Sequence, residues 1–597
     1  MIKVQFLPEN KTVTVPAGTT ILQAAIGAGV QIESTCGGRG TCGKCKVEKG
    51  SLNLSGSTVE QVLACQTALE EDIFIITKEN EEVSDRKINL GLGKEVAINT
   101  SIAKHFLSVP TPSLENPIPD WERLKGLLPN KTMIFRPSLV SKLPNLLRAN
   151  NHKVTVVMDS ESLIAIEPGD TRGRTFGLAI DLGTTTLVAH LINLETGKVI
   201  ASRATTNSQN VFGADVISRI TYAGKGHDEL KELQDRVINS LNSVIQDLGK
   251  VSGVDITEIY QTVVVGNTTM AHLFLGIDPT YLAPAPFTPA FSQEVEVEAR
   301  ELGLAMLSTG KVIVLPNIGG YVGSDTVGVM ISTEVDKLKG NNLIIDIGTN
   351  GELVLMGQGR ILTCSTAAGP AFEGAEIKFG MRAQKGAIEG VKIADDVKLT
   401  IIGSSKAQGI CGSGLIDAVA EMVRVGIIDR SGRFIKTDQL DRLPPLLASR
   451  VRNVDKGAEF VLVWAKDTVI GEDIVLTQKD IRELQLAKGA IVAGTKILLK
   501  TLGIGVNDLD QVLLAGAFGN YIKVESAQGM GLLPPIPLEK INSIGNAASE
   551  GAKMVLLSTR ERARSMTLAK KVEHMELSAH REFQELFIQS LSLGNVY

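Results

Sequence analysis

The stretch FGLAIDLGTTTLVAHL (residues 176–191) recurs in form as NNLIIDIGTNGELVLMG (residues 341–357). Each copy has an apolar strand that reaches an aspartate, Asp181 or Asp346, followed by a Gly-Thr turn and a second apolar strand. A single turn of this kind is also typical of an ordinary hairpin, but two at matching positions favour a duplication. The repeat therefore predicts two similar lobes that face each other across a cleft.

Both turns have the chemistry of a phosphate-binding loop. Gly183 and Gly348 permit a sharp reversal of the chain. The backbone N–H groups and the hydroxyls of such a turn can then cradle a phosphate. The hydroxyls belong to Thr184, Thr185 and Thr186 in the first turn and to Thr349 in the second.

The two aspartates predict a magnesium nucleotide in the cleft. Two carboxylates that meet repel each other unless a cation lies between them. Mg²⁺ takes only one or two carboxylates and keeps most of its waters. We therefore expect Asp181 to hold the hydrated Mg²⁺, and Asp346 to act on the metal or on the attacking water in phosphoryl transfer.

A third segment, QVLLAGAFGNY (residues 511–521), runs from an apolar strand into small residues. Gly516, Ala517 and Gly519 would let an adenine and its ribose lie flat against the backbone. With this segment the chain resembles the superfamily of actin, sugar kinases and heat-shock ATPases. The resemblance implies ATP binding and hydrolysis between two ribonuclease-H-like lobes, at 175–340 and 341–597.

Other segments supply further cleft candidates. GICGSGLIDAVAEM (residues 409–422) reads as a Gly-rich turn that opens a helix. Its free N–H groups could meet an anion, or the segment could be only a tight turn, and both interpretations stay open. Asn267, Asp325 and Glu373 lie where cleft-facing loops are expected. His272 follows an apolar run, which favours a core histidine over a catalytic one.

A different chemistry is indicated by STCGGRGTCGKC (residues 34–45), which places three cysteines around four glycines. With the thiol in LACQT the spacing is C-x5-C-x2-C-x19-C, similar to the adrenodoxin-like variant of two-iron ferredoxins. It predicts a 2Fe-2S cluster. A structural zinc is the alternative, although zinc ribbons usually carry two C-x2-C knuckles and this chain has one. The expected ligands are Cys36, Cys42, Cys45 and Cys65.

The residues around this stretch indicate a β-grasp domain. Residues 2–7 and 11–15 alternate apolar and polar like a short hairpin. Thr20 can cap a helix over 21–29, and 72–77 is expected to be a returning strand.

The length of 597 residues predicts several domains. We expect a ferredoxin-like domain at 1–84, a connector at 85–100 and a small α/β middle domain at 101–174. The middle domain has a helical pattern over 138–151 and two strands, KVTVVMD and ESLIAIE. The fold class is therefore mixed, α+β and α/β, in several domains.

Composition restricts the partners and the compartment. The chain is 21% charged with a net charge of −5 and no long basic run, so neither nucleic acid nor a membrane surface is expected as a partner. The N-terminal segment turns polar before a signal-like core forms, which predicts a cytoplasmic protein. Cys364 and Cys411 stand alone and are expected to be buried thiols, with a second metal site as the alternative. The cysteine pattern favours an anoxic or strongly reducing environment.

As a whole, this order of domains resembles the reductive activators of corrinoid-dependent methyltransferases. The resemblance implies a homodimer that uses ATP to reduce an inactive Co(II) corrinoid on a partner protein to Co(I). The electron would pass through the cluster held by the four cysteines, from a low-potential donor such as a ferredoxin or a flavodoxin. The chain lacks the C-terminal cysteines of the subgroup that carries two four-iron clusters.

Two other functions are alternatives to this one. The same cleft phosphorylates metabolites in related families, so a metabolite kinase with a regulatory iron-sulfur domain is the first alternative. A heat-shock-like ATPase whose cluster senses redox state is the second.

Overall fold

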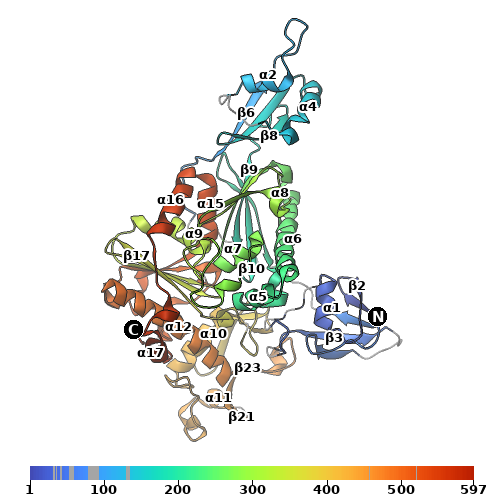
Figure 1. Cartoon of the computed structure of the whole chain (residues 1–597). Helices are drawn as coiled ribbons and strands as arrows, with labels where there is room; N and C mark the ends of the chain where they lie inside the picture. Colours follow the sequence, from blue (N-terminus) through green and yellow to red (C-terminus); the bar gives the residue numbers. More distant parts are fainter. Residues whose placement is uncertain are drawn as a thin grey trace.

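The computed structural model describes residues 1–597 except 31, 33, 35, 36, 41, 42, 53–58, 78–92, 129–134, 375, 456 and 520. Two of the expected cluster ligands, Cys36 and Cys42, and much of the expected connector lie outside the described residues. Figure 1 shows a two-lobed body with one small domain at its upper end and another at its side. The lateral domain is N-terminal, and the upper domain follows it in the sequence.

The N-terminal domain is the expected β-grasp. Its first two strands pair antiparallel, and the first strand pairs parallel with the last. Helix α1 (Ile21–Gly27) is capped by Thr20, whose hydroxyl accepts from the Gln23 N–H while the Gln23 side chain accepts from the Thr20 N–H. The sheet order is β2 (Lys11–Val15), β1 (Ile2–Leu7), β5 (Ile73–Ile76), β3 (Lys46–Ser51), β4 (Glu60–Leu63).

The second domain is an antiparallel sheet covered by short helices. The sheet consists of β6 (Ile102–Ser108), β7 (Lys153–Asp159) and β8 (Ser162–Pro168). The helical pattern over 138–151 forms two helices rather than one, because Pro144 has no N–H and is tolerated only in the first turn of a helix. The helices are α2 (Asp120–Gly126), α3 (Pro137–Val140) and α4 (Leu143–Ala149).

The two lobes confirm the duplication predicted from the repeat, because each is built on a six-stranded mixed sheet. In each copy the strand before the Gly-Thr turn pairs antiparallel with the strand after it. The first lobe has the order β11 (Val199–Thr206), β10 (Thr186–Asn193), β9 (Phe176–Leu182), β12 (Ile259–Gly266), β14 (Lys311–Val314), β13 (Val295–Glu298). The second has β25 (Ile541–Gly545), β24 (Gln511–Ala515), β15 (Asn342–Ile347), β16 (Gly351–Gly357), β17 (Arg360–Thr366), β26 (Glu573–His574).

Two helices, α9 (Ser324–Thr333) and α15 (Ala547–Leu557), lie between the two sheets and share one apolar core with both of them. Their backbones cross closely, since a Cβ at Gly551 would lie 2.0 Å from the Gly328 carbonyl oxygen. The lobes therefore meet through a tight helix crossing.

The outer faces of the sheets have their own helical layers. On the first lobe this layer is formed by α6 (His227–Ser252) and α7 (Thr268–Leu275), and on the second by α10 (Gly412–Arg424) and α12 (Gln478–Leu502). Among the described residues every helix is too short or too polar to cross a membrane. The remaining elements are α5 (Val216–Ala223), α8 (Ala299–Leu302), α11 (Pro445–Ala448), α13 (Gly516–Gly519), α14 (Val524–Gly529), α16 (Thr559–Lys571), α17 (Phe583–Gln589), β18 (Ala387–Ile393), β19 (Val397–Ile401), β20 (Gly409–Ile410), β21 (Val451–Val454), β22 (Gly457–Val463) and β23 (Ile474–Thr477).

Candidate functional site

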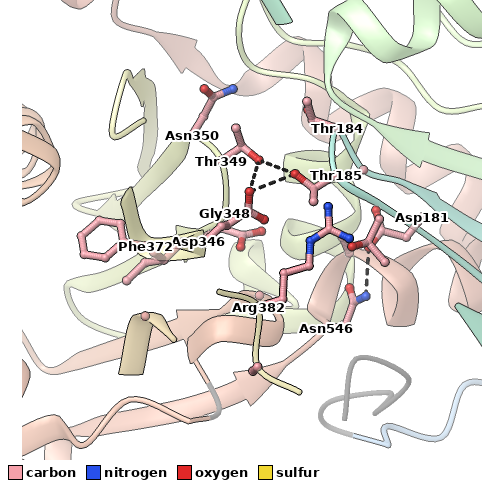
Figure 2. Close-up of a pocket in the computed structure, with 18 of the residues that line it drawn as sticks. Asp181, Thr184, Thr185, Asp346, Gly348, Thr349, Asn350, Phe372, Arg382 and Asn546 are labelled. Atoms are coloured by element: carbon pink, nitrogen blue, oxygen red, sulfur yellow. Dashed lines mark hydrogen bonds between the residues drawn. The ribbon is translucent and has the colours of Figure 1, made fainter. Parts of the chain in front are cut away.

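The two Gly-Thr turns meet at the interface of the lobes and line one pocket (Figure 2). The hydroxyls of Thr185 and Thr349 both donate to Oε2 of Glu373, at 2.9 and 3.0 Å. The two hydroxyl oxygens are themselves only 3.2 Å apart. One carboxylate therefore joins the first lobe to the second at the point where their turns face each other.

The first turn is held in place from behind by two buried polar side chains. Asn267 caps α7 and donates from Nδ2 to the Thr184 hydroxyl at 2.8 Å. Arg219 on α5 donates from Nη2 to the Thr184 carbonyl at 2.5 Å and is wholly buried. These bonds orient the turn, because its backbone acceptors have partners inside the first lobe.

The pocket wall carries several carboxylates close together. Asp181 accepts a hydrogen bond from Asn546 Nδ2 at 2.9 Å, whereas Asp346 ends the equivalent strand of the other lobe (Figure 2). Burial, and then the charges of Asp325 and Asp181, raise the pKa of Asp346 to about 7. Burial and the charge of Asp181 likewise raise the pKa of Asp325 to about 7. The pKa of Glu352 is also raised, by burial and by the neighbouring carboxylates of Asp325 and Asp346.

Such a concentration of carboxylates suits a site that binds a cation together with phosphates. Arg382 is the one Lys or Arg among the described residues that line the pocket. In the described part of the chain, no group of three or more His, Cys, Asp and Glu side chains has the arrangement needed to hold a metal ion by itself. This arrangement fits Mg²⁺, which needs only one or two carboxylates when phosphates and waters supply its other ligands.

The structure brings together most of the nucleotide-site residues expected from the sequence. Gly516, at φ +87°, lines the pocket beside Asp346, since a Cβ there would lie 2.6 Å from Asp346 Oδ1. Gly519 is not among the described lining residues, and the Ala517 side chain lies outside what the structure describes. The expected residues that line the pocket are Asp181, Gly183, Thr184, Thr185, Thr186, Asp346, Gly348, Thr349 and Gly516, together with the cleft candidates Asn267, Asp325 and Glu373.

The Gly-rich segment at 409–422 also reaches this pocket. Cys411, Gly412 and Ser413 line it, and α10 begins at Gly412. An anion-binding helix start requires this position beside the pocket. The position therefore favours the anion-binding interpretation over that of a tight turn alone.

His272 and the two lone cysteines were expected in the core, and the structure buries all three. His272 Nε2 accepts from the Ala290 N–H at 3.0 Å, and its Nδ1 lies 2.7 Å from the Thr268 carbonyl oxygen. The histidine is thus a satisfied core residue. Cys411, although buried, is also part of the pocket wall.

Sequence reasoning missed several residues of the site. Glu352 follows the second turn directly, and a charged residue at the start of an otherwise apolar strand was a signal for it. Arg382 donates to the Thr206 hydroxyl at 2.8 Å and so bridges the lobes, while Asn546 is 365 residues from its partner Asp181. No local pattern connects such distant residues.

The cysteine site lies in the N-terminal domain. Cys45 and Cys65 are buried, are not disulfide-bonded, and have sulfur atoms 3.3 Å apart. The glycines at 37, 38, 40 and 43 all have positive φ, as a tightly turning loop requires. Two converging thiols beside such a loop fit an iron-sulfur cluster, which thiolates hold within a compact loop.

Four family models match successive parts of the chain. The family model of a 2Fe-2S iron-sulfur cluster binding domain matches residues 4–70. The RACo linker region matches 91–173, the RACo middle region 176–338, and the C-terminal domain of RACo, the ASKHA domain, 340–596.

Relatives and a solved structure agree with these matches. The corrinoid activation enzyme RamQ of Eubacterium limosum is 34% identical over 578 residues, which cover 95% of this chain and 95% of RamQ. The [Co(II) methylated amine-specific corrinoid protein] reductase of Methanosarcina barkeri is 27% identical and covers 70% of this chain and 77% of its own. A solved reductive activator for corrinoid, iron-sulfur protein is 37% identical, with a TM-score of 0.76 over 100% of this chain and 99% of that one.

A ferredoxin-type domain, an ASKHA domain at 340–596 and a full-length relative at 34% identity lead to one conclusion. The chain belongs to the RACo family, the reductive activators of corrinoid proteins.

Proposed function

We propose that this protein reduces the inactive Co(II) corrinoid of a partner protein to Co(I), with an electron passed through its 2Fe-2S cluster and with ATP hydrolysed between its lobes. The observation that carries this proposal is the meeting of both Gly-Thr turns at Glu373 in a chain that also carries the paired thiols of Cys45 and Cys65. The names of the relatives supply the corrinoid protein as the partner.

The pocket residues have distinct roles in this proposal. Thr185 and Thr349 would offer hydroxyls to the phosphates, and Asp181 would hold hydrated Mg²⁺. Asn546 orients the Asp181 carboxylate through its hydrogen bond. Asp346, or Glu352 beside it in the paired strand, orients the attacking water. Phosphoryl transfer requires mainly such positioning and neutralisation of charge.

The need for ATP follows from the potential of the electron. When bound, a 2Fe-2S cluster of ferredoxin type supplies single electrons near roughly −400 mV. Moving one charge against each further 100 mV takes about 2.3 kcal/mol. An acceptor of lower potential therefore needs a coupled reaction, and the ASKHA lobes are placed to provide it.

Two finer points rest on the family resemblance. We propose that a low-potential ferredoxin or flavodoxin delivers the electron and that two copies of the chain associate. Mass in solution and reduction by candidate donors test these points separately.

The main proposal is tested by anaerobic spectroscopy. The protein, an artificial low-potential reductant and a candidate Co(II) corrinoid protein are mixed with and without Mg-ATP, and Co(I) formation is followed in the visible spectrum. We expect Co(I) only with ATP, none with Cys65→Ser, and about tenfold slower formation with Thr349→Val at low ATP concentration. The exposed Asp441→Asn variant is the matched control.

Two results would contradict the proposal. Co(I) formation at the same rate without ATP would show that ATP hydrolysis between the lobes is not required. Phosphorylation of a metabolite, with no spectral change for any corrinoid partner, would instead favour the kinase. ATP hydrolysis could act after electron transfer, by resetting the complex for the next turnover. Full multi-turnover reduction with a nonhydrolysable analogue would exclude that role.

A further inference from the structure

The loop that carries Cys45 touches both ATPase lobes. We define the cluster loop as the described residues 37–40 and 43–45. At one end Gly37 lies against the first lobe, where a Cβ would come within 3.1 Å of the Phe212 carbonyl oxygen. At the other end the Lys44 ammonium donates to two carbonyls of the second lobe, Ile377 at 3.1 Å and Gly380 at 2.7 Å.

On the first lobe, Arg219 connects the surface that Gly37 contacts with the first Gly-Thr turn. Phe212 ends the short helix η2 (Ser208–Phe212), and Gly213 follows it. Arg219 donates from Nε to the Gly213 carbonyl at 3.2 Å and from Nη2 to the Thr184 carbonyl at 2.5 Å. One buried guanidinium therefore binds both the first turn and the surface beneath the cluster loop.

On the second lobe, the contact point lies in the sequence between two residues of the pocket wall. Ile377 and Gly380 lie between Glu373 and Arg382, and both of these line the pocket. Glu373 joins the two turns, and Arg382 bonds the first lobe through Thr206. Lys44 thus binds the short segment that lies between the two cross-lobe contacts.

A third contact strengthens the interface away from the cluster loop. Arg236 on α6 donates from Nη2 to the Ile26 carbonyl in α1 at 3.1 Å. Its guanidinium also lies over the Phe212 ring, 5.1 Å from the centroid. The ferredoxin-type domain accordingly lies beside the α5 and α6 end of the first lobe in Figure 1.

We propose that these contacts form a docking interface between the ferredoxin-type domain and both lobes, and that nucleotide in the cleft controls it. The nucleotide part rests on the proposed function. A phosphate at the two turns competes with the Glu373 carboxylate for the hydroxyls of Thr185 and Thr349, because both are anionic acceptors. Displacement of Glu373 moves the segment that Lys44 binds. Because the cluster loop contacts both lobes, it cannot keep both contacts when one lobe shifts relative to the other.

Hydrogen–deuterium exchange of the full-length protein tests this interface. Lys44→Met removes the contact from the ferredoxin side, and Arg236→Gln removes one from the lobe side without altering the cluster loop. Lys46→Met is the matched control, since Lys46 is exposed in the same domain. Iron content is measured for each variant, so that loss of the cluster is recognised separately.

Without nucleotide, we expect exchange at 209–214 and 377–381 to rise about tenfold in Lys44→Met, since a hydrogen bond to a charged group contributes about ten- to a hundredfold to an equilibrium. Arg236→Gln should raise exchange at 209–214, and Lys46→Met should match the wild type. A Mg-bound nonhydrolysable ATP analogue should alter exchange of the Lys44 peptide in the wild type, and this response should be lost in Lys44→Met.

The outcomes separate the two proposals. Exchange in Lys44→Met and Arg236→Gln equal to that of the wild type overturns the docking interface. Protection of 183–186 and 348–350 by the analogue, with no change in the Lys44 peptide of the wild type, overturns control by nucleotide. If the analogue protects neither turn, both the ATP site and the control of the interface by nucleotide are overturned. The docking interface itself is still tested by exchange in the two variants measured without nucleotide.

Discussion

Removal of one negative charge from the pocket should stabilise the nucleotide-free protein while it abolishes ATP hydrolysis. The carboxylates of Asp181, Asp325, Asp346 and Glu352 share the pocket wall, and burial with mutual repulsion raises the pKa of Asp346 to about 7. Asp346→Asn keeps the shape of the side chain and removes its charge. The folded state should gain stability because the remaining carboxylates then repel less.

The size of the gain follows from the raised pKa. For Asp346 the pKa rises from 3.8 to about 7. Each unit of pKa corresponds to about 1.36 kcal/mol, which sets an upper bound of about 4 kcal/mol at pH 8. The side chain lies at the wall of a solvent-filled pocket, and screening reduces this figure to about 1–2 kcal/mol.

The pH dependence has a definite sign. In the folded state Asp346 and Asp325 take up protons near pH 7, whereas in the unfolded chain they stay ionised down to about pH 4. The folded state therefore binds more protons across this interval, and its stability falls as the pH rises through 7. The wild type should lose stability between pH 6 and pH 8, and Asp346→Asn should lose less.

Chemical unfolding under anaerobic conditions at pH 6, 7 and 8 measures both effects, and an ATPase assay on the same samples measures function. The exposed Asp441→Asn variant of the same lobe is the control and should change neither quantity. A destabilised Asp346→Asn protein at pH 8, or equal pH dependence in the two proteins, would refute the reasoning from charge repulsion.

Three further predictions concern the other parts of the molecule. Cys65→Ser should lose the iron and the visible colour but keep ATPase activity, whereas Cys364→Ala should keep its iron; metal analysis decides, and zinc in the wild type would contradict the cluster. Thr349→Val should lower kcat/KM for ATP about tenfold, because one hydrogen bond to a phosphate is lost; unchanged kinetics would remove this turn from the site. Arg219→Met should lower the free energy of unfolding by about 3–5 kcal/mol, since buried acceptors lose a charged partner; a change below about 1 kcal/mol in urea unfolding would show that they find other partners.

Much of the fold was predictable from local pattern. Alternation of apolar and polar residues at 2–7 and 11–15 indicated the hairpin, and the Thr20 cap indicated α1. The two Gly-Thr turns indicated the duplicated lobes. The helix expected over 138–151 is divided because Pro144 must occupy a first turn, which the apolar pattern alone did not reveal.

The candidate site was predictable only in part. The aspartates and threonines of both turns were visible in the sequence because each turn is a few residues long. Arg219, Asn546 and Arg382 were missed because their partners are distant in the chain, and the same holds for the bond from Lys44 to Gly380. Ordinary polar residues acquire these roles only through the neighbours that the fold gives them.

By itself, the sequence determined the turns, the strands beside them and the cysteine spacing, because backbone conformation and residue period are set within about ten consecutive residues. Tertiary structure alone decided that Thr185 and Thr349 meet on Glu373, that the carboxylates of Asp325 and Asp346 titrate near 7, and that the cluster loop rests on both lobes. Desolvation and charge interactions depend on every group packed around a side chain, and those groups come from the whole length of the chain.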